Sequence, residues 1–482
     1  MDMGDGVSAS APILRLPLEL LVSIAAGLTT PELCALRLTC RLVEELLYVT
    51  FTSEFFTKKQ FMITDVSLQA LIDISRSRLG LNLRHLHIGL DRFPDRLRQP
   101  LADDDRHRKF RQRYSDYLIL WDTGTHRTML TEALRNLSNL EEIVIRDFNS
   151  HKRTRDGPNA EWTSYGANTI FNETGVRLKQ GGSIPGRGCS QTFAVVLLAL
   201  GDAAVCPKGI QVMSHNRNRL WDYAFHIPRF MEPSVAPVLD KLEKLHLSID
   251  LSWMSSLSES ANDALVTGRP QSDTHSDTQL LRRFLRRTPN LKDLRINERW
   301  DQNPSLSDFL EWLAAPAPSQ DYASSAGDEG DKMTPPPVAL PHLEHLSLGC
   351  MIVGPQTLLQ VIRKFAPHLQ GLELWKISLH RSLPPGSDPN DPPRSNFWVD
   401  FMNQLKQVAW ADFRHFKAGM LKQTYTHGRE DYFVSFKKRG PVVEYTGPCW
   451  KDFFDEVTPL LDVTWRRPRS VTPESDVAVS PY

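Results

Sequence analysis

Residues 14–47 read LRLPLELLVSIAAGLTTPELCALRLTCRLVEELL, and this stretch decides how the rest of the chain is interpreted. Pro17 stands where the first turn of a helix tolerates proline. Apolar residues follow it at helical spacing, namely Leu20, Leu21, Ile24 and Leu28. The pattern predicts an amphipathic helix that begins near Pro17.

Two further short helices are expected after the first. Thr30, Pro31 and Glu32 supply an N-cap, a pre-set first-turn dihedral angle and a negative charge at the positive end of the helix dipole. The apolar residues of the second and third helices are Leu33, Leu36, Cys40, Leu42, Val43, Leu46 and Leu47. A segment below about 40 residues rarely folds alone, so we expect another surface to cover part of this apolar area.

The order of residues in this stretch resembles an F-box, in the form common in fungal F-box proteins. The resemblance is carried by Leu16, Pro17, Leu20, Leu21, Ile24, Leu33, Leu36, Arg37, Leu38 and Cys40. It implies a three-helix F-box over residues 12–50 that binds the Skp-type adaptor of an SCF (Skp, cullin, F-box) ubiquitin ligase and, through it, a cullin. The adaptor-binding role goes to these residues as a group, because some of them must instead hold the helices together. Val43 departs from the family, which often has a tryptophan there, and the alternative is an ordinary small helical domain with leucine-rich faces.

Composition limits the classes of protein that fit. The chain has 57 basic and 57 acidic residues, a balance that argues against a nucleic-acid partner. Its six cysteines form no CxxC pair, so we expect neither a metal site nor a disulfide framework, and a cytoplasmic or nuclear location. The acidic amino terminus and the short apolar run 193–200 predict a soluble protein without a membrane partner, since a spanning helix needs about 20 apolar residues.

A leucine phrase with offsets of three and then two recurs along the chain. It occurs at Leu83-Leu86-Ile88, Leu140-Ile143-Ile145, Leu242-Leu245-Leu247, Leu291-Leu294-Ile296, Leu343-Leu346-Leu348, Leu369-Leu372-Leu374 and weakly at Leu405-Val408-Trp410. Each resembles the core of a leucine-rich repeat, in which a short strand buries alternate residues. Helical patterns precede most of these strands, at 65–77, 127–136, 278–287, 356–365 and 396–404.

These observations predict an α/β protein with a small all-α F-box followed by an irregular leucine-rich-repeat-like solenoid over residues 60–425. The uneven spacing of the phrase indicates hidden or inserted units. The alternative is an α/β domain with a parallel sheet whose strands happen to be rich in leucine. We expect insertions at 149–190, 252–277 and 315–337, because these segments are rich in Gly, Ser, Pro and polar residues. The first is expected to be a long loop or a partly ordered insertion, and the last a flexible spacer.

The carboxy-terminal part, 426–463, is expected to hold a hairpin and a helix. The hairpin strands are 432–436 and 442–445 around a Lys-Lys-Arg-Gly-Pro turn, and the helix spans 450–457. The tail 464–482 is predicted to be disordered.

No familiar catalytic pattern is present, and we expect no cofactor and no catalysis by this chain. The glycine cluster at 181–188 has neither a GK[ST] ending nor a GxGxxG opening. His342 and His345 lack the Cys or carboxylate neighbours of a metal site. The basic run 106–114 follows three aspartates, which favours a solvated helix face over a nucleic-acid site.

Substrate recognition is expected on the strands, because residues between the buried leucines share the opposite face. These residues are His85, His87, Lys244, His246, Asp293, Arg295, His345, Ser347, Glu373 and Trp375. Arg295, Glu373 and Trp375 are the main candidates to bind an unknown protein substrate, since Arg and Trp are frequent at interface hot spots. The alternative function is a leucine-rich-repeat scaffold or interaction protein without a ligase role.

Overall fold

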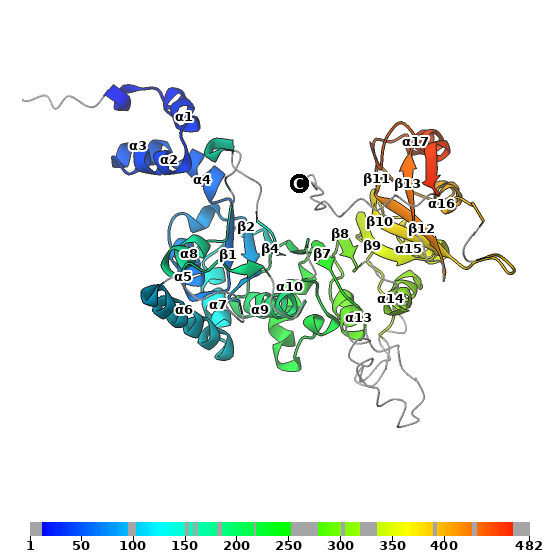
Figure 1. Ribbon diagram of the computed structural model, residues 1–482, viewed down its shortest axis with the longest axis horizontal. Helices are drawn as coiled ribbons and strands as arrows, with labels where there is room; N and C mark the ends of the chain where they lie inside the picture. Colours follow the sequence, from blue (N-terminus) through cyan, green and yellow to red (C-terminus); the bar gives the residue numbers. More distant parts are fainter. Residues whose placement is uncertain are drawn as a thin grey trace, which may run out of the picture. The chain divides into compact units, whose positions relative to one another are not determined.

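The computed structural model describes residues 12–94, 103–149, 154–157, 160, 162–180, 186–215, 218–251, 278–299, 304–318, 335–388, 393–426 and 431–465. The described part is mixed α/β, and its strands belong largely to a mostly parallel sheet (Figure 1). The chain divides into two compact units, 1–246 and 247–482. The first unit contains both the amino-terminal helices and the first leucine-patterned strands.

Four short helices, not three, form the amino-terminal part. They are α1 (Leu18–Ala26), α2 (Thr30–Arg37), α3 (Arg41–Leu46) and α4 (Tyr48–Phe55), after a 3₁₀ turn at Pro12–Arg15. The fourth helix was not expected, and its Phe51 and Phe55 complete the core that Leu21, Leu33 and Val43 begin. These helices therefore bury apolar surface that the predicted three could not.

The N-cap of α2 is Thr29, one residue before the expected position. Glu32 accepts hydrogen bonds from the Thr29 N–H at 2.9 Å and from its hydroxyl at 2.8 Å, which closes a capping box. Thr30 is the first residue of the helix, so its own side chain is available for another contact.

Five parallel strands form the sheet of the first unit, in the order β1-β2-β4-β6-β7. Their bounds are β1 Lys58–Met62, β2 His85–Gly89, β4 Glu142–Arg146, β6 Gly209–Met213 and β7 Lys244–Ser248. The expected strands β2, β4 and β7 are confirmed. Strand β6 is a unit that carries no leucine phrase, and it fills the long gap between the second and third phrases. Strand β1 is another strand without the phrase.

Helices alternate with these strands and pack beside one another. They are α5 (Asp65–Arg76), α7 (Thr125–Arg135), α9 (Arg187–Ala203) and α10 (Glu232–Asp240). Leucine-phrase residues such as Leu86, Ile143 and Leu245 are fully buried. The phrase therefore marks the side chains that enter the core.

Of the two alternatives for the segment 149–190, its described part is an ordered insertion and not a long loop. It contains α8 (Ala167–Thr174), β5 (Lys179–Gln180) and the first turn of α9. Helix α8 packs on α6 (Asp104–Asp122), and β5 pairs with β3 (Asp91–Arg92). Low apolar content misled the prediction, because the few apolar residues of this segment, Ile170 and Val176, are buried in the aromatic cluster around Phe93 and Phe110. The expected insertion 252–277 and residues 319–334 of the next one lie outside the described residues.

The second unit repeats the alternation of strand and helix. Its parallel strands are β8 (Asp293–Asn297), β9 (His345–Val353), β10 (Gly371–Arg381), β11 (His415–Gly419) and β12 (Leu421–Tyr425). Its helices include α13 (Gln279–Arg286), α14 (Pro304–Ala314), α15 (Pro355–Phe365) and α16 (Phe397–Lys406). The weak strand expected at 405–410 is wrong. Leu405 lies in the last turn of helix α16, and the next strand, β11, begins at His415.

Three adjacent strands of this unit bend at the same place. Cys350, Lys376 and Met420 have positive φ values of 55°, 53° and 53°. They are in register, since the preceding residues Gly349, Trp375 and Gly419 pair across the sheet.

The carboxy-terminal strands are confirmed, but the expected hairpin pairing is wrong. Strand β13 (Tyr432–Phe436) pairs with β12 and with β15 (Leu461–Thr464), while β14 (Val442–Thr446) pairs with β11. Each strand thus adds to the sheet, antiparallel to its neighbour, and the turn between them leads from one sheet strand to another. The helix expected at 450–457 is confirmed as α17 (Trp450–Val457). Thr464 ends β15, and the expected tail from residue 466 lies outside the described residues.

Candidate binding surfaces

The residues that carry the F-box resemblance divide into three groups by exposure. Leu21 and Leu33 are core residues, only 1% and 2% exposed. The half-buried residues are Leu16, Leu36, Arg37 and Cys40. The exposed residues are Pro17, Leu20, Ile24 and Leu38. The sequence alone could not make this separation.

Helix α1 is apolar on two sides. Leu21 and Ala25 face the core of the amino-terminal helices, whereas Leu20 and Ile24 are 52% and 46% exposed. Residues four apart lie on the same side of a helix, so Leu20 and Ile24 form one outward apolar strip. Exposed apolar side chains that lie together indicate a surface that binds a partner.

Further apolar side chains are exposed nearby in the chain. Leu18 is 45%, Leu38 85% and Leu42 46% exposed. Leu18 and Leu42 were not among the candidates. The density of apolar residues in 14–47, too high for a single buried stripe, was the signal that could have found them.

Arg37 has a structural position within the same helices. Its guanidinium lies over the Phe51 ring, 3.4 Å from the centroid, and its Nη2 donates to Glu44 Oε1 at 2.7 Å. With its side chain only 12% exposed, Arg37 holds α2 against α3 and α4. The charge of Arg78 and that of Arg37 lower the pKa of Glu44, although burial opposes this shift.

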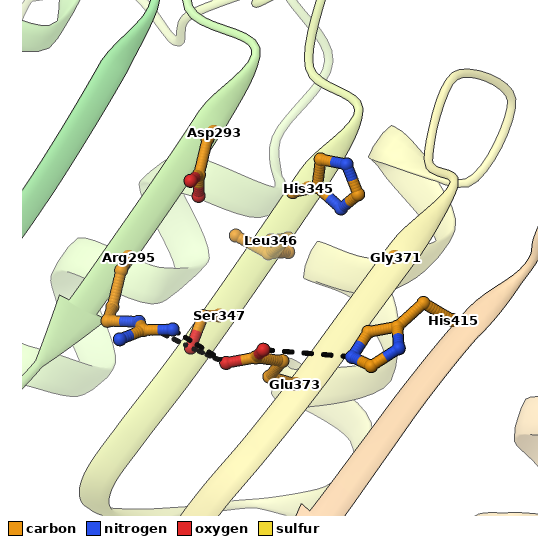
Figure 2. Close-up of a pocket in the computed structure, with 8 residues that line it drawn as sticks. All are labelled: Asp293, Arg295, His345, Leu346, Ser347, Gly371, Glu373 and His415. Atoms are coloured by element: carbon orange, nitrogen blue, oxygen red, sulfur yellow. Dashed lines mark hydrogen bonds and ion pairs between the residues drawn. The ribbon is translucent and has the colours of Figure 1, made fainter. Parts of the chain in front are cut away.

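The second surface is a pocket of about 310 Å³ on the polar face of β8, β9, β10 and β11 (Figure 2). Its lining residues are Asp293, Arg295, His345, Leu346, Ser347, Gly371, Glu373 and His415. Arg295 and Glu373, two of the three main substrate-binding candidates, meet in it. Arg295 Nη2 donates to Glu373 Oε2 at 2.8 Å, and Arg295 Nε donates to Ser347 Oγ at 3.1 Å.

Glu373 is the centre of the polar contacts in this pocket. Ser347 Oγ donates to its Oε2 at 3.2 Å, and His415 Nε2 lies 3.7 Å from its Oε1. Figure 2 shows the four side chains in a row across the strands. Their side chains remain partly open, at 22% for Arg295, 30% for Glu373 and 24% for His415.

Strand register explains why these residues meet. Arg295, Ser347 and Glu373 pair in one row of the sheet, and Asp293, His345, Gly371 and His415 pair in the row beside it. A Cβ atom at Gly371 would clash with the His345 ring, so the absence of a side chain there leaves the space that the pocket occupies. His415 was not a candidate, because the strand that carries it was predicted eight residues too early: Phe416, and not Val408, pairs with Leu372. Gly371 was not a candidate because it has no side chain.

Trp375 lies one row further and does not line the pocket. It is half-buried, and a Cβ atom at Gly419 would clash with its ring. Trp375 therefore lies over the neighbouring strand β11. The structure brings two of the three main candidates together and places the third beside them.

The polar face of the first unit carries four further recognition candidates, of which two are half-buried and two are buried. Lys244 Nζ and Gln211 Nε2 donate to the Glu142 carboxylate at 3.0 and 2.8 Å, and His85 Nδ1 lies 3.4 Å from it. The Lys244 ammonium lowers the pKa of Glu142 even though burial opposes this.

The two central histidines of this face are only 4% and 6% exposed, for His87 and His246. Burial, helped by the nearby Arg146 charge, lowers the pKa of His87 to about 2. A histidine in such a position stays neutral and acts as a packed core residue. It is not available to a substrate.

A chain of buried hydrogen bonds closes the same face. Arg146 Nε donates to Gln60 Oε1 at 2.7 Å, Gln60 Nε2 donates to Ser164 Oγ at 2.8 Å, and the Ser164 hydroxyl donates to Asp91. Burial lowers the pKa of Arg146 to about 10 and raises that of Asp91. Ser164 belongs to the segment 149–190. The hydrogen bond by which it covers this face joins two residues that are 104 positions apart in the sequence.

The basic run of α6 is matched by acidic residues. Asp103 caps the helix, Asp105 pairs with Arg108 and Lys109, and Arg113 pairs with Glu173 and Asp65. These pairs favour the expected structural helix face.

Neither a protein-family model nor a curated protein matches this chain in sequence. Across the described ranges, no three His, Cys, Asp or Glu side chains are grouped so that they could hold a metal ion. Within those ranges, every helix is too short or too polar to cross a bilayer.

Proposed function

We propose that this chain is the substrate-recognition subunit of an SCF-type ubiquitin ligase. In this proposal, the amino-terminal helices are an F-box that binds the Skp-type adaptor, and the leucine-patterned strands are degenerate leucine-rich repeats that bind a protein substrate. The observation that carries the proposal is the outward apolar strip of Leu20 and Ile24 on a helix whose other side already faces a core.

The chain would act by proximity and would not catalyse the transfer itself. Other subunits carry out ubiquitin transfer, and this chain holds a substrate lysine near the charged conjugating enzyme. Burying a leucine or isoleucine side chain contributes about 1.5 to 3 kcal/mol to the free energy of binding. The exposed apolar residues of α1, α2 and α3 would therefore form the energetically important centre of the interface with the adaptor.

The adaptor interaction is tested with a surface variant, Leu20→Ala with Ile24→Ala. It should lose capture of the Skp-type adaptor in a pull-down, because it removes apolar contacts without touching the core. A matched control is Leu118→Ala with Ile119→Ala on α6, two side chains that are 41% and 61% exposed. Unchanged capture by the α1 variant would contradict the adaptor assignment.

A core variant separates folding from binding. Leu21→Ala should destabilise the amino-terminal helices by about 2 to 5 kcal/mol, and adaptor capture should fall with the loss of helical structure. The surface variant should lose capture while its circular dichroism and thermal unfolding remain those of the parent.

Substrate binding is tested by affinity purification with mass spectrometry under proteasome inhibition. Arg295→Ala with Glu373→Gln in the pocket, and separately Trp375→Ala beside it, should each remove at least one captured protein and leave the adaptor bound. Arg299→Ala is the control, because Arg299 is an exposed arginine that pairs with Asp250 away from the pocket residues. A protein list identical to that of the parent in both variants would exclude this face as the recognition surface.

The presence of a cullin distinguishes the proposal from its alternative. A cullin should co-purify with the parent chain and be lost with the α1 surface variant. A chain that captures proteins through its strands but never the adaptor or a cullin would be a repeat scaffold without a ligase role.

A further inference from the structure

The neighbouring residues Arg155 and Asp156 contact the amino-terminal helices from a distant part of the chain. They belong to a short 3₁₀ turn, Thr154–Asp156, between β4 and α8. This turn lies in the segment 149–190, which was expected to be a long loop or a partly ordered insertion. Its contacts reach residues more than 100 positions away.

Arg155 holds the carboxyl end of α1 and the side of α4. Its Nη1 donates to the carbonyl oxygens of Ala25 and Leu28, at 3.0 and 2.7 Å. Its Nε and Nη2 donate to the two oxygens of Glu54, both at 2.6 Å. The side chain is only 10% exposed, so this fork of hydrogen bonds is largely shielded from water.

Asp156 holds the amino end of α2. Its carboxylate accepts from the Thr30 N–H at 2.7 Å and from the Thr30 hydroxyl at 2.6 Å. Helix ends carry partial charges, negative at the carboxyl end and positive at the amino end. The cation of Arg155 and the anion of Asp156 therefore match the ends of two consecutive helices.

The other polar contacts of the amino-terminal helices attach a different part. Glu44 of α3 pairs with Arg78, and the Tyr48 hydroxyl of α4 donates to the Arg78 carbonyl oxygen at 2.8 Å. These contacts hold α3 and α4, whereas Arg155 and Asp156 also reach α1 and α2. Helix α1 carries the exposed Leu20 and Ile24, so its orientation decides where a bound partner would lie.

We infer that Arg155 and Asp156 form a clamp that positions α1 and α2 on the first unit. The two residues act as positioning residues, because they touch the helices and not the partner. As far as it concerns ubiquitin transfer, this inference rests on the proposed function. A rigidly placed adaptor keeps the reacting groups at a defined separation, and small misplacements of reacting groups slow a transfer strongly.

The clamp is tested by the spread of distances between two labels in the full chain. Spin labels carried by unnatural amino acids at the exposed positions 35 in α2 and 69 in α5 report the orientation of α2. The parent should give a narrow distance distribution. Arg155→Gln with Asp156→Asn should give a broad one, and a distribution as narrow as that of the parent would overturn the inference.

Two further variants show whether loss of the clamp or general destabilisation broadens the distance distribution. Thr30→Val removes the hydroxyl contact with Asp156 but leaves the Thr29–Glu32 capping box of α2, so it should broaden the distribution without unfolding the helix. Arg113→Gln removes a comparable forked pair with Glu173 elsewhere in the same unit and should leave the distribution narrow. Broadening by Arg113→Gln would mean that general destabilisation, and not the clamp, causes the effect.

Adaptor capture and ubiquitin transfer separate the clamp from the proposed function. The clamp variants should still capture the adaptor, because Leu20 and Ile24 are unchanged, but ubiquitin transfer to a captured substrate should slow. If the parent itself does not capture the adaptor, the proposed function fails while the label distances still decide whether the clamp exists. Transfer at the parent's rate by a variant with a broad distribution would overturn the functional role of the clamp.

Discussion

The polar face of the leucine-patterned sheet is covered in the first unit and open in the second. In the first unit, His87, Arg146 and His246 are 4%, 5% and 6% exposed. In the second unit, Arg295, Glu373 and His415 line an open pocket. The strand pattern places polar residues on one face in both units, and it does not determine whether that face stays open.

The two parts of this face differ in whether residues from elsewhere in the chain cover them. In the first unit, Ser164 reaches Gln60 and Asp91, and the Tyr165 N–H donates to the Gln60 carbonyl oxygen at 2.9 Å. In the second unit, Gly371 stands where a side chain would fill the face. A buried polar face stabilises a fold only if its members are paired, whereas an open one can exchange partners.

The largest expected contrast comes from removing the arginine of each face. Arg146→Ala should destabilise the first unit by about 3 kcal/mol, because it leaves the buried Gln60 oxygen without its donor and opens a cavity. Arg295→Ala should cost less than about 1 kcal/mol, since its ion pair is partly exposed. Hydrogen exchange of β2 and β4, compared with β9 and β10, measures both effects. Equal losses would show that the two faces are energetically alike.

A smaller contrast comes from adding one methyl group to each face. Gly89→Ala should cost about 2 kcal/mol, because its Cβ meets Ser164, Asp91 and Gln60 in a closed network. At Gly371→Ala, the neighbouring His345 ring belongs to an exposed residue and can turn aside. This second variant should keep its thermal stability and lose substrate capture. Retained capture with a filled pocket would place recognition elsewhere.

The smallest contrast is a dependence on pH. The pKa of His87 is lowered from 6.5 to about 2 in the folded chain, so below pH 6.5 the unfolded chain binds a proton that the folded chain does not. Between pH 6.5 and 5.5, the stability of the first unit should therefore fall by at most about 1.4 kcal/mol. His87→Gln should remove this part of the slope. An unchanged slope of hydrogen-exchange stability between pH 6.5 and 5.5 would show that His87 is not the group responsible.

The secondary structure followed from sequence where the pattern was local. Leucine phrases gave strands β2, β4, β7, β8, β9 and β10 at their expected places, and the 450–457 pattern gave α17. Prediction was wrong where a partner from far along the chain decided the outcome. Val442–Thr446 forms a strand as expected but pairs with β11, because that edge is available only in the folded sheet.

The candidate sites show the same limit. Arg295 and Glu373 were identified as residues that share a face, since alternate strand residues point the same way. Whether they lie beside His415 depends on the register between β10 and β11. No local sequence pattern between these two strands predicts that register. Likewise, Leu20 and Leu21 are adjacent leucines of one helix, and only packing against Phe51 and Phe55 decides that Leu21 is buried and Leu20 exposed.

The sequence by itself determined the helices and strands that carry a regular apolar pattern and which of their side chains share a face, because both properties repeat with a short period along the chain. Only the tertiary structure decided which face is covered, which apolar side chains remain exposed, and that Arg155 and Asp156 hold the ends of α1 and α2. These outcomes depend on contacts between different helices and strands, some of them more than 100 positions apart. Such contacts form only when the whole chain packs, so no local pattern carries them.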